Sequence, residues 1–123
     1  MHQKKGRLKW LNRGEIYLAD LNPTIGSEQG GVRSVLILQH DIGNFYSHTT
    51  IIASMTSMFR NKKHIPTHFI VSAREELMND SIVLLEQIRT ISKSRLIKKI
   101  GELSTEEMNS LNKCLFISMG IKN

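Results

Sequence analysis

Cysteine, long apolar runs and acidic residues are all scarce in this chain, and each shortage excludes a class of protein. The single cysteine, Cys114, has no partner for an internal disulfide, and no grouping of cysteine and histidine has the spacing of a zinc site. The longest apolar runs, at residues 35–38 and 82–85, are far too short to span a bilayer, and no apolar stretch follows the basic N-terminus. The sequence therefore predicts a protein of a reducing, cytoplasmic compartment that is neither secreted by a standard signal nor embedded in a membrane.

The shortage of acidic residues gives the chain a basic balance. Lysine and arginine total 17 against 11 aspartate and glutamate residues, so the net charge is +6 and the pI is about 9.7. Such a balance favours a polyanion or an acidic protein as partner, and charge alone does not choose between them. With 40% hydrophobic residues in a chain of 123, the composition is that of one globular domain.

Part of the positive charge lies in an N-terminal arm. Residues 1–13 carry five lysine and arginine side chains and no acidic residue. We interpret them as a solvated basic arm, or simply a frayed terminus, in front of a domain at residues 14–123. Trp10 either pins this arm to the domain or offers a surface on which a base stacks.

Short strands dominate the pattern up to about residue 100. Between the second and the third strand, residues 41–49 are predicted as a loop, because Gly43 and Asn44 are turn formers. Neither an internal repeat nor a low-complexity segment is present. Alternating and β-branched apolar residues predict strands that begin at residue 14 and then lie at 35–38, 50–57, 67–71, 81–85 and 88–91. The run at 35–38 is fully apolar, which suits a buried strand.

The last segment follows a different pattern. Ser104 and Glu107 have the spacing of a capping box, and Leu103 and Met108 have that of a hydrophobic staple, so a helix is predicted to begin there. Apolar residues from Met108 to Leu115 recur at helical spacing and give the helix one apolar face. We expect this face to pack on the strands, with binding of a partner as the alternative.

The most distinctive segment is the run at residues 22–33, N-P-T-I-G-S-E-Q-G-G-V-R, which lies between two predicted strands. Its three glycines permit backbone angles that other residues resist and let a ligand approach the backbone closely. Arg33 stands where the next strand begins and would be held by it. Because binding and catalytic residues concentrate on loops held by rigid strands, this segment predicts a functional site.

Several blocks of residues also occur together, and in the same order, in one known family. They are Arg13-Gly14-Glu15-Ile16-Tyr17, Gly26-Ser27-Glu28-Gln29-Gly30-Gly31-Val32-Arg33, Asp41-Ile42-Gly43-Asn44, the strand ending at Thr56, Pro66-Thr67-His68 and Leu84-Leu85-Glu86-Gln87-Ile88-Arg89-Thr90-Ile91. Over about 110 residues the chain thereby resembles the MazF/PemK family of toxin endoribonucleases from toxin–antitoxin systems. The resemblance implies a mainly β, α+β fold: an SH3-like, partly open β-barrel with a C-terminal helix packed on it, assembled as a symmetric homodimer.

The same resemblance implies an activity and partners. Members of the family cleave single-stranded RNA at a short sequence without a metal or other cofactor, and leave a 2′,3′-cyclic phosphate and a 5′-hydroxyl. They are held inactive by an antitoxin whose acidic, largely disordered tail occupies the RNA groove. Such a tail would suit the net positive charge of this chain.

The positions that match the family's catalytic pair are Arg33 and Thr56. The guanidinium of Arg33 can hold two phosphoryl oxygens, and because arginine stays protonated it suits donation to the leaving oxygen better than removal of the 2′ proton. Thr56 would donate its hydroxyl to a phosphoryl oxygen. The alternatives are a surface salt bridge between Arg33 and Glu28, and an ordinary β-branched strand residue at position 56.

Polar residues near this pair are candidates for reading the bases of single-stranded RNA, with loop capping or solvation of a sheet edge as their alternative role. These candidates are Ser27, Glu28, Gln29, Ser57 and Gln87.

Other residues have two interpretations each. Phe45 and Tyr46 either form a stacking surface or tether their loop to the core. The basic run Arg60, Lys62 and Lys63 either contacts flanking phosphates or lies in a solvated turn. Among the histidines, His48 is the candidate for assisting proton transfer, whereas His68 stands at a family position interpreted as structural.

One departure from the family pattern leaves alternatives open. Ser34 follows Arg33 where the family usually has proline, which frees a backbone N–H and loosens the entry to the strand. A catalytically silent module that binds RNA or antitoxin therefore remains an alternative. A gyrase-poisoning, CcdB-like toxin is another, although the terminal Trp-Gly-Ile of that family is Met119-Gly120-Ile121 here.

Overall fold

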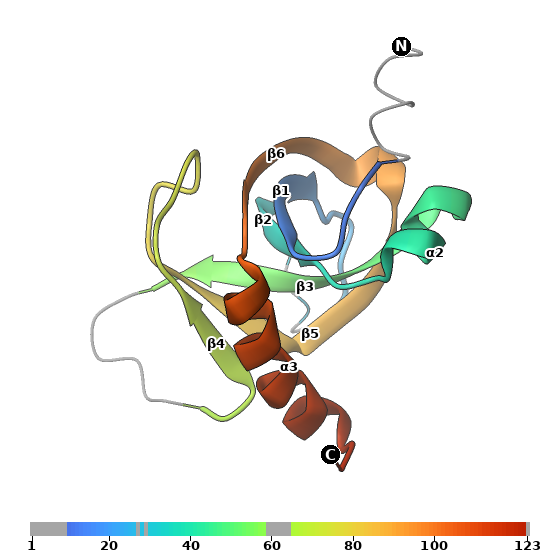
Figure 1. Ribbon diagram of the computed structural model, residues 1–123. Helices are drawn as coiled ribbons and strands as arrows, with labels where there is room; N and C mark the ends of the chain where they lie inside the picture. The colour runs from blue at the N-terminus through green and yellow to red at the C-terminus, as the bar shows by residue number, and fades with distance from the viewer. Residues whose placement is uncertain (1–9, 27, 29, 59–64, 123) are drawn as a thin grey trace.

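The computed structural model describes residues 10–26, 28, 30–58 and 65–122 (Figure 1). In chain order its elements are β1 (Glu15–Asp20), β2 (Val32–Ile37), α2 (Asp41–Tyr46), β3 (Thr49–Ser57), β4 (His68–Val71), β5 (Ser81–Ser92), η1 (Lys93–Arg95), β6 (Leu96–Glu102) and α3 (Thr105–Met119). No helix among the described residues is long and apolar enough to cross a membrane.

The strands form one antiparallel sheet in the order β4-β5-β3-β2-β1-β6. The sheet curls round into a barrel that stays partly open, since the end strands β4 and β6 are not neighbours (Figure 1). Helix α3 packs against β4 and β5. The predicted α+β fold, a partly open barrel with a C-terminal helix packed on it, is therefore confirmed.

Strand β2 is buried on both of its faces, as its apolar run predicts. Leu36 belongs to a core cluster that also holds Met108 and Leu111 of α3. Val35 and Ile37, which point to the other face because side chains alternate along a strand, belong to a second cluster. Arg33, near the start of β2, is thus carried by an element that is clamped from two sides.

The prediction of two short strands at 81–85 and 88–91 is wrong, because both are parts of the single strand β5. This strand pairs with β3 along its length, from Ser57↔Ser81 to Thr49↔Ser92. The polar residues Glu86 and Gln87 interrupt the apolar pattern at an irregularity, where the register moves from Ser54↔Leu84 to Ala53↔Ile88. Because β5 pairs with β3 on both sides of this bulge, the strand continues through it.

The prediction of a loop at 41–49 is also wrong, because residues 41–46 form the short helix α2. His40 caps its start, with Nδ1 accepting a hydrogen bond from Ile42 N at 3.1 Å. The predicted turn former Asn44 is fully buried. Its side chain donates to Gln39 O at 2.9 Å and accepts from Thr50 Oγ1 at 2.6 Å. These tertiary hydrogen bonds stabilise a helical turn that the local sequence does not favour.

Helix α3 begins as predicted. Ser104 Oγ accepts a hydrogen bond from Glu107 N at 3.1 Å, and Glu107 Oε1 accepts one from Ser104 N at 2.9 Å, so the capping box is complete. Leu103 and Met108 are both buried in one cluster, as expected for a hydrophobic staple. Strand β6, which leads into this helix, has no counterpart among the predicted strands.

Residues 10–13 lie against the barrel. Leu11 is buried in the second core cluster. Arg13 Nε donates to Leu38 O at 2.8 Å, and its Nη2 donates to Asn112 Oδ1 at 2.7 Å, so this side chain connects the end of β2 with α3. The basic residues before Trp10 lie outside the described part of the chain.

Candidate active site

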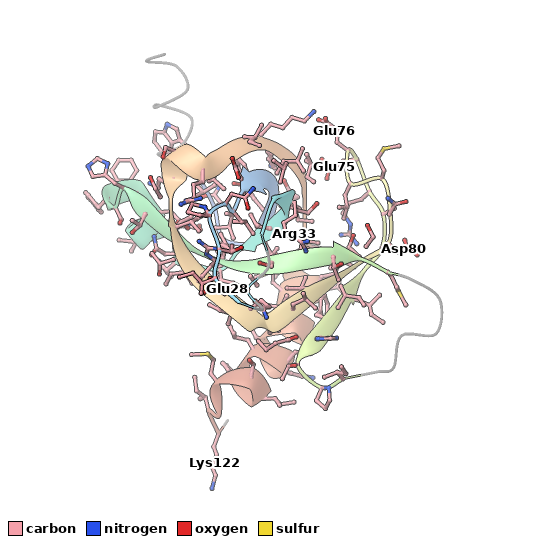
Figure 2. The ribbon with its side chains drawn as sticks, turned by 180° about the vertical axis from the view of Figure 1, so that it is seen from behind. Glu28, Arg33, Glu75, Glu76, Asp80 and Lys122 are labelled. Atoms are coloured by element: carbon pink, nitrogen blue, oxygen red, sulfur yellow. The ribbon has the colours of Figure 1, made fainter. Side chains whose placement is uncertain are left out.

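A pocket of about 500 Å³ opens where β2, β3 and β6 meet the loop at residues 72–80. Arg33, Thr56 and Ser57 line it together with Ser34, Lys98 and Met78. Figure 2 shows Arg33 near the middle of the view, with the loop that carries Glu75, Glu76 and Asp80 on one side of it. The structure thus brings three of the predicted site residues into one hollow, although Arg33 and Thr56 are separated by a whole strand and a helix in sequence.

Arg33 is held by backbone carbonyls rather than by an acidic residue. Its Nε donates to Gly30 O at 3.1 Å, and its Nη1 donates to Met55 O at 3.2 Å. Within the described residues no ion pair involves Arg33. Glu28, the suggested partner, instead accepts a hydrogen bond from Ile25 N at 3.0 Å. The guanidinium is therefore fixed between the glycine loop and the end of β3 with its positive charge uncompensated, which suits the binding of a phosphate.

Thr56 and Ser57 follow directly after the carbonyl that holds Arg33. In the β3–β5 ladder they pair with Ile82 and Ser81, so both stand on regular strand backbone. Thr56 is half-buried and Ser57 is exposed. This arrangement brings a hydroxyl donor and a fixed guanidinium to the same pocket.

Close contacts and hydrogen bonds hold the two described ends of the glycine loop together. Gly31 has φ +77°, a conformation that other residues avoid, and its N–H donates to Asn22 Oδ1 at 2.9 Å. A Cβ on Gly30 would lie 2.6 Å from Thr24 Oγ1, too close for any side chain without a shift. Arg89 Nη1 donates to Leu21 O at 3.3 Å and so connects the start of the loop with β5.

Two of the predicted base-reading residues lie in a different hollow. Glu28 and Gln87 line a pocket of about 250 Å³ together with Glu86, Ile88 and Arg89. Gln87 reaches it from the bulge of β5, and Glu28 from the glycine loop. Ser27 and Gln29 lie outside the described residues, as do Arg60, Lys62 and Lys63.

The sequence patterns did not predict the residues that form one wall of the larger pocket. Lys98 of β6 and Glu76, Met78 and Asn79 of the loop at 72–80 all line it, and Lys98 Nζ lies 2.8 Å from Glu76 Oε1. No local motif marks these residues, because the curvature of the sheet brings β6 and the loop to the start of β2. The basic residue Lys98 is the only signal that the sequence offers, and it is one of many lysines.

An ion pair fixes this loop to α3. Arg74 Nη1 and Nη2 donate to the two carboxylate oxygens of Glu107 at 2.5 and 2.7 Å. The hydrogen bonds from Arg74, opposed by partial burial, lower the pKa of Glu107 to about 2. Glu76 N donates to Ile100 O at 3.0 Å, which fastens the tip of the loop to β6. The pocket wall is therefore tied to both neighbouring elements.

The described histidines are not among the residues that line the pocket of Arg33. His68 Nε2 lies 3.0 Å from Glu86 Oε2. Burial opposes ionisation of Glu86, but hydrogen bonds from His68, from the backbone and from Thr67 outweigh it together, so the pKa of Glu86 is lowered. His48 is exposed, and it is not among the residues that line either pocket. Within the described residues, no three His, Cys, Asp or Glu side chains are grouped as a metal site would need.

The model of one protein family, described as PemK-like and MazF-like toxins of type II toxin–antitoxin systems, matches residues 12–119. The chain belongs to the PemK/MazF family. Endoribonuclease MazF of Staphylococcus saprophyticus is 49% identical to it over 112 residues, which cover 90% of this chain and 92% of the relative. This PemK/MazF protein is therefore an endoribonuclease toxin of a toxin–antitoxin system. The two alternative functions, a gyrase poison and a catalytically silent binding module, are set aside.

Solved structures of two MazF proteins and of another endoribonuclease share the fold. Mycobacterium tuberculosis toxin MazF-mt6 superimposes with a TM-score of 0.74 at 21% identity, covering 89% of this chain and 99% of that one. MazF from Deinococcus radiodurans gives a TM-score of 0.73 at 23% identity, covering 90% and 97%. An endoribonuclease from a mycobacterial species, in complex with its cognate antitoxin, gives 0.74 at 23% identity, covering 92% and 98%.

Proposed function

We propose that this toxin cuts single-stranded RNA at a short specific sequence and leaves a 2′,3′-cyclic phosphate and a 5′-hydroxyl, without a metal ion. The ribose 2′-oxygen loses its proton to solvent and forms a bond to the adjacent phosphorus, the bond from phosphorus to the 5′-oxygen breaks, and the 5′-oxygen takes a proton from Arg33, which solvent then replaces. The observation that carries this proposal is the shared pocket of Arg33 and Thr56, in which two backbone carbonyls fix the guanidinium.

Arg33 and Thr56 have different tasks in this reaction. The guanidinium of Arg33 binds the phosphoryl oxygens, stabilises the charge that builds up in the transition state and donates a proton to the leaving 5′-oxygen. The hydroxyl of Thr56 donates a hydrogen bond to a phosphoryl oxygen. Ser34, which replaces the family's usual proline, pairs with Leu18 in an unbroken β1–β2 ladder, so the strand that carries Arg33 keeps its register.

The first experiment tests cleavage itself. The purified toxin is incubated with a long mixed-sequence RNA in excess EDTA, and the new ends are sequenced. We expect cuts at one short motif with 5′-hydroxyl ends. Uncut RNA, or ends that carry a 5′-phosphate, would contradict the proposal.

Substitution of Arg33 tests its assigned role. Arg33→Ala should lower the rate of cleavage at least about 100-fold while most of the affinity for RNA remains, because the lost interactions are strongest in the transition state. Arg33→Lys keeps the charge but loses the planar pair of donors, so we expect a similar loss. A variant that folds normally and cuts at the wild-type rate would remove Arg33 from the mechanism. Lys122→Ala, far from Arg33 in Figure 2, is the control.

We further propose that Ser27, Glu28, Gln29, Ser57 and Gln87 read the bases. Because Glu28 and Gln87 line their own hollow, next to the glycine loop, this hollow would hold a base beside the cleaved bond. Gln87→Ala should therefore broaden the set of cut sequences more than it slows cutting, and sequencing of the ends measures both effects. An unchanged motif would exclude Gln87 from base recognition.

We also propose a cognate antitoxin with an acidic tail, and a homodimer. The net charge of +6 favours an acidic partner, and the mycobacterial endoribonuclease, related in fold, was solved with its cognate antitoxin. An acidic peptide should compete with RNA for the pocket of Arg33. Sedimentation of the purified chain measures the oligomeric state.

A further inference from the structure

A second surface gathers exposed rings at the flank of the barrel. Trp10, Phe45 and Tyr46, which we call the aromatic patch, are joined through Phe45: the ring centroids of Trp10 and Phe45 are 5.6 Å apart, and those of Phe45 and Tyr46 are 4.9 Å apart, edge to face. Trp10 is 70% exposed, Phe45 38% and Tyr46 79%. Rings are normally buried for the free energy that this gives, so a cluster left in water indicates a binding surface.

The patch is built on a firm support. Phe45 and Tyr46 are the last residues of α2, and the residue before them, Asn44, is completely buried. The buried ammonium of Lys93 donates to Asn44 O, and Lys93 N donates to His48 O at 2.9 Å. At the other end of α2, Arg13 N donates to Asp41 Oδ1 at 2.6 Å. Rings that are already ordered lose little conformational entropy when a ligand binds.

The charge of the sequence that leads into the patch selects the kind of ligand. The residues that precede Trp10 in the sequence include Lys4, Lys5, Arg7 and Lys9, with no acidic residue. Aromatic rings combined with basic residues are what single-stranded nucleic acid needs, because bases stack on the rings and cations attract the phosphates. An apolar protein partner would gain nothing from this charge.

We propose that the aromatic patch is a base-stacking surface for single-stranded RNA that extends beyond the pocket of Arg33. The proposal rests on RNA being the substrate, as in the proposed function. Figures 1 and 2 show α2 and the loop at 72–80 on opposite sides of the barrel. An RNA that reaches both must therefore cross the barrel, so a long strand gains contacts that a short substrate lacks.

The only tryptophan of the chain is Trp10, which gives the experiment a specific signal. The full chain with Arg33→Ala, which leaves RNA intact, is titrated with a long single-stranded oligoadenylate while the fluorescence of Trp10 is followed. We expect saturable quenching, because a stacked base quenches the indole, and no quenching by polyphosphate, which has the charge but no bases. Tyr46→Ala should weaken the affinity about tenfold. Ile70→Ala, an equally simple truncation at an exposed site on β4, should not change it.

Several results would overturn the proposal. The first is that oligoadenylate does not bind at all, or that anisotropy of a labelled oligoadenylate shows binding while the fluorescence of Trp10 stays unchanged. The second is that polyphosphate quenches Trp10 as strongly as oligoadenylate does. The third is that the Tyr46→Ala and Ile70→Ala variants bind oligoadenylate with equal affinity. Quenching by an acidic peptide but not by RNA would make the patch a protein contact and would also overturn it. The end-sequencing experiment tests the proposed function separately. If the toxin cuts RNA but RNA does not quench Trp10, only the proposal for the aromatic patch is contradicted. If RNA quenches Trp10 but is not cut, only the proposed nuclease function is contradicted.

Discussion

At the scale of single residues, one buried hydroxyl stands out. Ser54 in β3 is 1% exposed, and its Oγ is the one buried side-chain polar atom among the described residues that has no hydrogen-bond partner. It lies between Val35 and Leu84 in the ladder, at the residue where the register of β3 and β5 shifts. An unsatisfied hydroxyl in such a place costs stability, because folding removes its water without replacing the hydrogen bond.

Ser54→Ala should therefore raise the free energy of unfolding, by about 1 kcal/mol. Thr50→Val is the matched comparison: its hydroxyl is equally buried but donates to Asn44 Oδ1, so its removal should destabilise the protein by about 1–3 kcal/mol. Urea unfolding of the three proteins measures both effects. If Ser54→Ala were as destabilising as Thr50→Val, the hydroxyl of Ser54 would have a partner in solution.

At the scale of elements, the ion pair between Arg74 and Glu107 joins the pocket wall to α3. The carboxylate of Glu107 has two roles, since it also completes the capping box with Ser104. Glu107→Gln separates them, because glutamine can still accept the hydrogen bond from Ser104 N but cannot pair with a guanidinium as an ion. The variant therefore isolates the contribution of the ion pair.

We expect this contribution to depend on pH. The pKa of Glu107 falls from its ordinary 4.5 to about 2 in the folded protein, so the folded state favours the ionised form. The stabilisation is then complete above about pH 5 and is lost as the pH falls toward 2. At neutral pH, Glu107→Gln should lower the free energy of unfolding by about 1–2 kcal/mol, and near pH 2 the two proteins should unfold alike.

The control for this experiment is the other ion pair at the pocket, between Lys98 and Glu76, whose side chains are 55% and 61% exposed. Exposed pairs contribute little, so Glu76→Gln should leave the stability nearly unchanged at either pH. Urea unfolding at the two pH values gives all the differences. A Glu107→Gln difference that persists unchanged in acid would show that the lost interaction is not ionic.

At the scale of the whole molecule, the net charge of +6 predicts how the toxin binds RNA. Contacts with phosphates release counterions, so the affinity should fall steeply with salt. Lys98→Ala, which removes a cation from the pocket, should reduce the slope of log affinity against log salt by about 0.7, the value for one phosphate of a single strand. Lys122→Ala should leave the slope unchanged. The slopes are measured by anisotropy titrations of the Arg33→Ala variants at a series of salt concentrations. Equal slopes for all variants would show that Lys98 does not contact the RNA.

The sequence by itself determined the features that depend on neighbouring residues. The capping box of Ser104 and Glu107 predicted the start of α3, because both hydrogen bonds lie within one turn. The apolar run of β2 predicted a strand that is buried on both faces. The blocks around Arg33 and Thr56 were enough to identify the family, because such blocks preserve a site even where overall identity is low.

Only the tertiary structure decided which distant residues meet. Asn44 is a turn former in isolation, and it is part of a helix because Gln39 and Thr50 satisfy its side chain. The curvature of the sheet brings Lys98 to the pocket of Arg33, and the same curvature places Gln87 with Glu28 in a separate hollow. These contacts join strands far apart in the chain, so their free energy depends on long-range pairing that no local pattern of residues encodes.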